Sequence, residues 1–244
     1  MTGEQAKQTR AAEGGGSAVQ DDYLEALYNL EMESEQASGA VLARRFAVSR
    51  ASVSATLQRL TRAGLIEGSG RGEVRLTAEG RQHAERILRR HRLAERFLAQ
   101  TLGMDWITAH EQAHHLQSGL TPLMEESMAA TLGHPTTCPH GNPIPGEVPD
   151  ATAYLRDQNA ARLSTVSVGQ AVVVVCISEL VEDETALLRY VGEKGLRPAA
   201  QLTVLERVPG EGGTLHLQVG HKQVAVDAHL AALIWVRPAD HQLT

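Results

Sequence analysis

The stretch that decides the fold reads SGAVLARRFAVSRASVSATLQRLTRAGLIEGSGRGEVRL and covers residues 38–76. A serine just before an apolar-periodic run is a favoured helix N-cap, and glycine commonly ends a helix. The pattern therefore predicts one helix that opens at Ser38 and a second that opens at Ser49 and ends at Gly64. Residues 47–49 form the short break between them.

A hairpin is expected directly after these helices. Residues 65–67 and 73–76 read as two short strands around a glycine-rich turn. Upstream, apolar residues recur at spacings of three and four from Asp21, which predicts a further helix. Helix, helix, tight turn, helix and hairpin are typical of a winged helix-turn-helix.

Such a unit binds DNA by placing a helix N-terminus in the major groove and a basic wing against phosphate. Trihelical units of this kind also serve as protein-interaction modules, which is the alternative. The expected DNA contacts start the last helix or flank it: Ser49, Arg50, Ser52, Ser54, Arg44, Arg59, Arg62, Arg71 and Arg75.

The charge distribution favours DNA over the protein-interaction alternative. The 244 residues carry a net charge of −6. Residues 41–96 hold thirteen arginines, no lysine and five glutamates, a net charge of +8, so the remainder carries −14. A basic block on an acidic protein indicates a segment that meets an anion, commonly a nucleic acid, although a solvated arginine-rich helix face gives the same count.

Composition excludes several classes of protein. The chain is 42% hydrophobic and 21% charged, which is ordinary for a soluble protein. No apolar run approaches the roughly 20 residues of a membrane helix, and no secretory leader is recognisable. Cys138 and Cys176 form no CxxC pair, which excludes a disulfide scaffold. We therefore expect a cytoplasmic protein with no membrane partner.

The fold class predicted for the whole chain is mostly α with a small β domain. A helix capped by Thr77 and one or two helices over 105–132 follow the hairpin, and five prolines in residues 134–149 predict a rigid, extended connector. Short strands with glycine turns then predict a small barrel. The expected domains are a disordered tail (1–18), the winged helix (19–77), a helical domain (78–134), a linker with a short helix (135–163) and the barrel (164–244).

An apolar stripe runs along the last part of the helical domain. It is either internal core or the dimer interface that a regulator of palindromic DNA needs. Its members are Leu116, Leu120, Leu123, Met124 and Met128.

Histidines and carboxylates gather in the helical domain. Seven of the eleven histidines fall between residues 83 and 140. His91 with Glu95, and His110 with His114, are one helical turn apart, and Asp22 precedes a second carboxylate three residues on. Residues at these spacings share a helix face, so pairs on facing helices can converge on one ion. Imidazole with carboxylate suits a divalent metal of intermediate hardness, although isolated pairs are often only solvated.

Residues 110–114 also match the zinc-peptidase pattern H-E-x-x-H. The longer form of that pattern requires glycine at position 117 and histidine at position 120, where this chain has Gln117 and Leu120. Five-residue patterns arise by chance, so a metallopeptidase is only a remote alternative, and no enzymatic activity is expected.

Three segments together resemble the diphtheria toxin repressor family of metal-dependent transcriptional regulators. They are Asp22-Tyr23-Leu24-Glu25, residues 90–96 (RHRLAER) and residues 141–146 (GNPIPG), and the likeness extends over residues 21–238. The resemblance implies an N-terminal winged helix, a helical dimerisation and metal-binding domain, and a C-terminal SH3-like (FeoA-like) barrel.

The resemblance also implies a ligand set. Asp22 and Glu25 match ligands of the manganese branch, and His91 matches a histidine common to both branches. Glu95 and His110 match the ancillary site of the iron branch, with Glu184 as the carboxylate that the barrel lends. The full set is Asp22, Glu25, His91, Glu95, His110, His114, Gln117 and Glu184.

The chain departs from the family pattern at three of the aligned ligand positions, two of them in the first of the family's two neighbouring metal sites, called the primary site. Gln117 and Ser118 stand where the family has glutamate and histidine, and Leu187 replaces a second barrel ligand. The site is then weaker, rearranged, or completed by Glu111 or His115. Cys138 and His140 lie in the proline-rich connector, where a structural turn is favoured and a role as metal ligands is the alternative.

The function that follows is a metal-responsive, homodimeric regulator that binds a palindromic operator in double-stranded DNA. It is expected to repress metal-uptake genes. Because neither methionine nor cysteine occupies an aligned ligand position, Mn²⁺ is favoured and Fe²⁺ comes second, while Zn²⁺ is expected to substitute in vitro. A winged-helix regulator that has lost metal control is the alternative.

Overall fold

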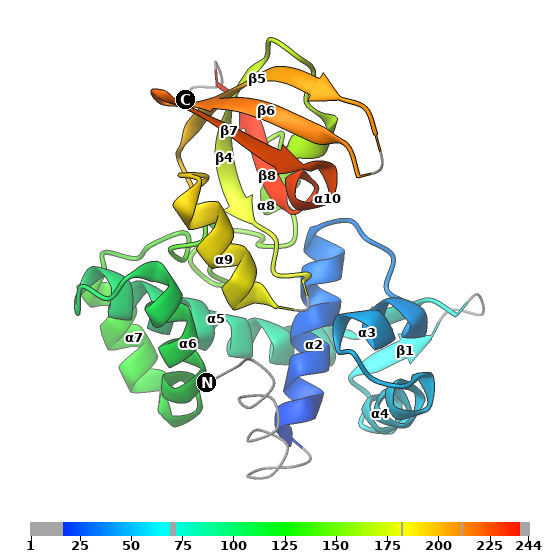
Figure 1. Cartoon of the computed structure of the whole chain (residues 1–244). Helices are drawn as coiled ribbons and strands as arrows, with labels where there is room; N and C mark the ends of the chain where they lie inside the picture. The colour runs from blue at the N-terminus through cyan, green and yellow to red at the C-terminus, as the bar shows by residue number, and fades with distance from the viewer. Residues whose placement is uncertain (1–16, 69–71, 182, 211, 240–244) are drawn as a thin grey trace.

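The computed structural model describes residues 17–68, 72–181, 183–210 and 212–239. Three parts surround one central helix, α2 (Ser17–Met32): the winged helix, a bundle of helices and a β domain (Figure 1). None of the helices in the described ranges combines the length and the apolar character that a membrane crossing requires.

The winged helix confirms the prediction made from residues 38–76. It comprises α2, α3 (Gly39–Arg45), α4 (Arg50–Arg62), β1 (Ile66–Gly68) and β2 (Val74–Leu76). The Ser38 and Ser49 hydroxyls accept hydrogen bonds from the first turns of α3 and α4, as expected of N-caps. Gly64 follows α4 with a φ of +71°, a conformation that glycine adopts without strain.

One boundary differs from the sequence prediction, and parts of two predicted segments lie outside the described residues. The tail was expected to run to residue 18, but α2 begins at Ser17 because the helix extends one turn before its apolar face starts. Residues 1–16, the rest of that tail, lie outside the described residues. So does the tip of the wing, residues 69–71, which includes Arg71.

Two long helices build the second part. They are α5 (Ala78–Gln100), capped by Thr77 as predicted, and α6 (Trp106–Leu116), which packs along it. A short 3-10 turn, η1 (Gln117–Gly119), leads to α7 (Pro122–Thr131).

The C-terminal part is a six-stranded antiparallel sheet around its own apolar core. The sheet order is β3-β8-β4-β5-β6-β7, and β-bulges in β4 and β5 bend it. Its elements are α8 (Tyr154–Asp157), β3 (Ala161–Arg162), η2 (Leu163–Thr165), β4 (Ala171–Ile177), α9 (Glu184–Glu193), β5 (Gln201–Val208), β6 (Thr214–Val219), β7 (Lys222–Asp227), α10 (Ala228–Ala231) and β8 (Ile234–Pro238).

Helix α9 is absent from the sequence prediction, although its signals are present. Asp183 caps it, and Leu187, Leu188 and Val191 bury one face in the sheet's core. Its Gly192 leaves room for the indole of Trp106, because a Cβ there would lie 2.9 Å from the ring. Trp106, from α6, belongs to the same core, so the helical part and the β domain are packed into one unit.

The proline-rich connector is buried rather than merely extended. Cys138, His140, Asn142 and Ile144 are each at most 1% exposed. Gly141 allows this close approach: it has a φ of +87°, and a Cβ would lie 2.1 Å from the carbonyl oxygen of Val175 in β4. The connector therefore forms the contact between α5 and the β domain.

We predict that Gly141→Ala costs more than about 2 kcal/mol, because it adds left-handed backbone strain to a direct clash with β4. Thermal unfolding should show a midpoint at least about 4 °C lower. Gly119→Ala is the control, since nothing lies within 4 Å of a Cβ at Gly119. Equal midpoints for the two variants would contradict this account of the connector.

Candidate metal centre and nucleic-acid interface

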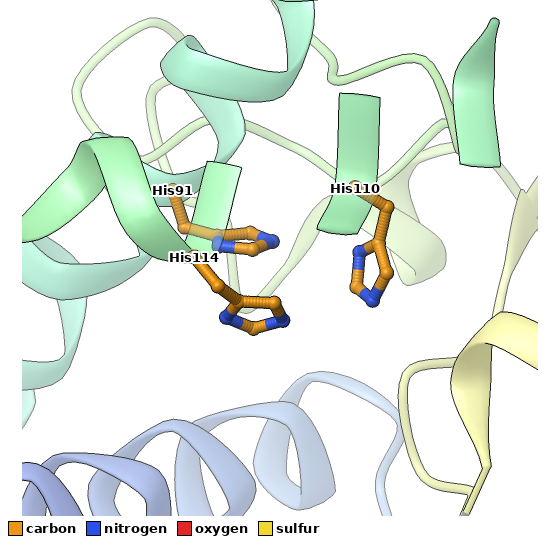
Figure 2. Close-up of side chains that lie close together, drawn as sticks. All are labelled: His91, His110 and His114. Carbon is orange, nitrogen blue, oxygen red and sulfur yellow. The ribbon is translucent and has the colours of Figure 1, made fainter. Parts of the chain in front are cut away.

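Three histidines from two packed helices converge on one space. His91 lies on α5, and His110 and His114 lie one turn apart on α6. One nitrogen from each ring lies within 4.8 Å of the others. Figure 2 shows the three side chains projecting into the same space, with α2 in blue across from them. The predicted convergence of one-turn pairs is therefore present.

Glu95 lies at the centre of a second, overlapping group. Its Oε1 atom is 2.8 Å from His110 Nδ1, 3.1 Å from His91 Nε2 and 3.2 Å from His140 Nδ1. The side chain is only 1% exposed, and its other oxygen, Oε2, is buried without a hydrogen-bond partner. Three imidazoles around one carboxylate with an orphaned oxygen form a donor set that a divalent cation would satisfy.

The charges of this cluster are strongly coupled. Burial alone would raise the pKa of Glu95, but His140 and His91 outweigh it and hold that pKa well below the usual range. Burial alone would lower the pKa of His110, but Glu184 and Glu95 outweigh it and raise that pKa to about 9. His110 therefore carries a proton at neutral pH in the metal-free protein.

His140 is the site residue for which the sequence favoured a structural turn over a ligand role. Its Nε2 atom is 3.1 Å from the carbonyl oxygen of Trp106, which orients Nδ1 toward Glu95. Cys138 Sγ is 3.7 Å from the same Nδ1, and burial raises the pKa of that thiol well above its ordinary value. The expected turn is present, since the Gly141 amide donates to the carbonyl oxygen of Cys138. The same turn places the His140 imidazole against Glu95 and the Cys138 thiol against His140. The sequence feature that could have indicated this role is the pair of potential metal donors Cys138 and His140, two residues apart and followed by Gly141.

Gln117 lies beside His91 and contributes a neutral amide there. Its side-chain oxygen is 2.8 Å from His91 Nδ1, so the amide orients the imidazole. The two residues that sequence analysis offered as replacements, Glu111 and His115, are both exposed and belong to neither ligand group. Ser118 is also exposed and donates to the carbonyl oxygen of His115.

The β domain contributes one carboxylate to the cluster. Glu184, at the start of α9, has Oε2 3.9 Å from His110 Nε2. Leu187, one turn later, is 4% exposed and packs in the core of the β domain, so it offers no donor. The structure thus places Glu184 beside His110 and Leu187 away from the cluster.

Asp22 and Glu25 lie half-buried on α2, outside the two groups whose donor atoms lie within 4.8 Å. Glu25 nonetheless acts on His91: burial opposes protonation of that imidazole, and the charges of Glu95 and Glu25 raise its pKa. The helix that carries the two carboxylates packs along α5. The two acids are thus placed beside the histidines rather than among them.

The DNA-contact candidates lie mostly on one exposed helix. The N-terminus of α4 follows Ser49, whose hydroxyl bonds the backbone and hydroxyl of Ser52, so Ser49 also stabilises the helix. Arg75 pairs with Glu73 at 3.0 Å and remains 64% exposed. The exposed candidates are Arg44, Ser49, Arg50, Ser52, Ser54, Arg59, Arg62 and Arg75.

The arginines of α5, which belong to the basic block over residues 41–96, include several that form ion pairs within the protein and so are not available to bind DNA. Four arginines of α5 pair with acids from the rest of the chain: Arg81 with Glu31, Arg89 with Glu147, Arg90 with Glu125 and Arg92 with Glu179. These pairs hold α5 to α2, α7, the connector and the β domain. Exposed arginines that remain to face an external anion lie on α3, α4 and β2: Arg44, Arg50, Arg59, Arg62 and Arg75.

The apolar stripe divides into two parts. Leu120 is 4% exposed and joins an internal core with Leu116 and Met128. Leu123 and Met124, on α7, are 77% and 43% exposed. Only these two residues of the stripe remain as an external apolar surface.

Comparisons with known proteins agree with this arrangement. Three family models match: the iron-dependent repressor N-terminal DNA-binding domain over residues 17–74, the iron-dependent repressor metal-binding and dimerisation domain over 77–146, and the FeoA domain over 161–238.

Curated relatives and solved structures cover nearly the whole chain. The iron-dependent repressor IdeR of Mycobacterium tuberculosis is 34% identical over 221 residues, 88% of this chain and 94% of that protein. The diphtheria toxin repressor of Corynebacterium diphtheriae is 29% identical over 76% of this chain and 83% of its own length. The structure of a manganese-dependent transcriptional repressor with manganese superposes with a TM-score of 0.72 at 29% identity, covering 90% of this chain and 99% of that one. With the three domains matched in order, the chain belongs to the iron-dependent repressor family that includes the diphtheria toxin repressor.

Proposed function

We propose that this protein is a metal-activated, homodimeric transcriptional repressor that binds a palindromic DNA operator in response to Mn²⁺ or Fe²⁺. The observation that carries the proposal is the buried Glu95 carboxylate, ringed by His91, His110 and His140 and with one oxygen unpartnered. A buried carboxylate without a full set of partners is costly unless a cation completes it.

The residues that would hold metal divide by element. His91 and Glu95 come from α5, His110 and His114 from α6, His140 from the connector and Glu184 from the β domain. Asp22 and Glu25 would join from α2. A bound divalent cation would supply positive charge that attracts the carboxylates of α2 and α9 toward the imidazoles. Gln117 orients His91, and Trp106 orients His140 through its carbonyl oxygen.

The link to DNA runs through α2. Helix α2 carries the two carboxylates, Asp22 and Glu25, on one turn. It also packs against the winged-helix core through Tyr23, whose ring stacks on that of Phe46 with centroids 4.4 Å apart. Holding α2 against α5 and α6 therefore fixes the position of α4. In a dimer this sets the spacing of two recognition helices to two half-sites.

A second copy is expected to cover the apolar surface of α7. Leu123 and Met124 of α7 are exposed. Helix α7 lies at the outer side of the helical part, away from the winged helix (Figure 1). The matched family model for this part is a dimerisation domain. A two-fold symmetric pair would match a palindromic operator.

The donor set supports the choice of ion. Imidazole and carboxylate ligands suit Mn²⁺ and Fe²⁺, and the same set also binds Zn²⁺ in vitro. The relatives that match are named as iron-dependent or manganese-dependent repressors. Mn²⁺ is the first ion to test.

The proposal predicts that Mn²⁺ increases the affinity for operator DNA by about 5- to 150-fold. The measurement is a titration of a labelled duplex from the chain's own upstream promoter, in chelator and in Mn²⁺, at one fixed salt concentration, because affinity depends steeply on salt. His91→Ala and Asp22→Ala should abolish the gain and keep the fold.

The matched control is His115→Ala, because His115 is an exposed histidine of α6, the helix that carries His110 and His114, and belongs to neither ligand group. It should retain the full gain. If both ligand variants kept the gain, the site assignment would be wrong. If the unmodified protein showed equal binding with and without Mn²⁺, the metal-independent alternative would replace the proposal.

Metal binding is also predicted to release protons. Because the pKa of His110 is raised to about 9, the ring is protonated below that pH and must lose its proton to act as a ligand. Apparent Mn²⁺ affinity should therefore rise by about tenfold per pH unit for each proton released, and level off above about pH 9. Calorimetry in buffers of different ionisation enthalpy counts the protons. A count of zero near neutral pH would exclude His110 as a ligand.

Restoring a carboxylate at position 117 should strengthen the site. The Gln117 side-chain oxygen already lies 2.8 Å from His91 Nδ1, so Gln117→Glu adds a negative charge without a change of shape. At a partly buried site this charge should tighten Mn²⁺ binding by about tenfold or more, as competition with a chromogenic chelator would measure. Gln112→Glu, on the exposed face of α6, is the control. Equal affinity for both variants would place the ion away from Gln117.

A further inference from the structure

The C-terminal end of α2 is enclosed by polar groups of the β domain. Ser178, just after β4, donates to Glu33 Oε1 at 2.6 Å. The Arg162 guanidinium lies 2.9 Å from Glu33 Oε2 and donates to Glu35 at 2.9 Å. The Glu33 side chain is fully buried. A buried carboxylate held by two groups of another domain fixes the helix end in one orientation.

One turn earlier, a second buried network ties α2 to both neighbouring domains at once. The Asn29 amide donates to Glu179 Oε2 at 2.8 Å, and its oxygen accepts from Arg92 at 2.9 Å. Arg92, on α5, is fully buried, pairs with Glu179 at 2.7 Å and donates to the carbonyl oxygen of Pro143. The four residues of this network come from four different segments, namely α2, α5, the connector and the turn after β4, so none of these segments can shift here without breaking a buried bond.

Apolar contacts complete the attachment. Met32, the last residue of α2, is 2% exposed and packs with Val175, Cys176 and Trp235 of the sheet. Trp235 also lies beneath the Arg162 guanidinium, whose central carbon is 4.4 Å from the ring centroid. Figure 1 shows the upper end of α2 reaching the β domain, while its lower end lies beside the helical part.

We propose that the β domain anchors the C-terminal end of α2, so that Asn29, Glu33 and Arg162 are positioning residues for the metal-dependent movement of the winged helix. They touch neither DNA nor the metal cluster. With one end of α2 fixed, the carboxylates about two turns away can move only about that point, so closing them on the cluster gives one defined position of α4. The β domain thus determines the direction of the response as well as lending Glu184. This inference rests on the proposed function.

The test uses the full chain with Glu33→Gln and Arg162→Met combined. Changing both residues removes the ion pair without leaving one charge buried alone. Asn29→Ala is a second, milder variant that leaves the Arg92–Glu179 pair in place. The matched control is Arg156→Met, because the Arg156 side chain is 79% exposed and its ion-pair partner within the described part of the chain is the exposed Asp157.

Two measurements separate positioning from simple loss of structure. The first is the spin-label distance distribution between Cys introduced at Gln58 on α4 and at Leu205 on β5, in metal-free protein; both native cysteines are buried. The second measurement compares two quantities in each variant: the affinity for Mn²⁺, and the factor by which Mn²⁺ increases the affinity for DNA. We expect the combined variant to broaden the distance distribution and to reduce the Mn²⁺-dependent gain in DNA affinity to less than about threefold, while its Mn²⁺ affinity stays within about threefold of the unmodified protein.

A narrow distribution and a full gain in both anchor variants would overturn the anchor. A parallel loss of Mn²⁺ affinity and thermal stability would also overturn it, since that pattern describes a structural role only. If the unmodified protein shows no gain with Mn²⁺, the proposed function fails, yet the distance distributions still decide whether the β domain holds α2.

Discussion

Two buried charges in the middle of α5, Arg92 and Glu95, determine how the three parts of this molecule fit together. Neither can be left without partners, because an isolated ion away from water costs several kcal/mol. Arg92 takes its partners from α2, the connector and the β domain. Glu95 takes its partners from α6 and the connector as well as from α5 itself. The same helix therefore specifies the domain arrangement with one charge and the candidate metal centre with the other.

This division explains how a local event at the cluster can reach the DNA-facing helix. Arg92 is already satisfied by protein groups, so its contacts hold the arrangement in the absence of metal. Glu95 is not fully satisfied, since one oxygen is buried and unpartnered, and its histidines compete for the other. A site that is assembled but incompletely neutralised is suited to respond to a cation. Helix α2 is hydrogen-bonded to the β domain at its C-terminal end and carries Asp22 and Glu25 near its N-terminal end.

Much of this organisation could be predicted from the sequence because the signals are local. The serine caps at 38 and 49 and the glycine at 64 set the helix-turn-helix, and one-turn spacing placed His110 and His114 on one face. His140 could not be ranked above a structural turn, because its approach to Glu95 depends on Gly141 passing against β4 some 35 residues later in the chain. The pairing of the α5 arginines was equally out of reach, since their acidic partners are spread from Glu31 to Glu179. Helix α9 has a capping residue, Asp183, and an apolar face, but it is a single short helix between two strands of a β-rich segment, β4 and β5.

The central claim is that a divalent cation binds among His91, Glu95, His110 and their neighbours. The most direct test is anomalous diffraction from crystals of the protein grown with Mn²⁺, recorded on both sides of the manganese absorption edge. The account predicts an anomalous peak in contact with the His110 ring and the Glu95 carboxylate. Anomalous peaks confined to exposed carboxylates, with none at His110, would contradict it.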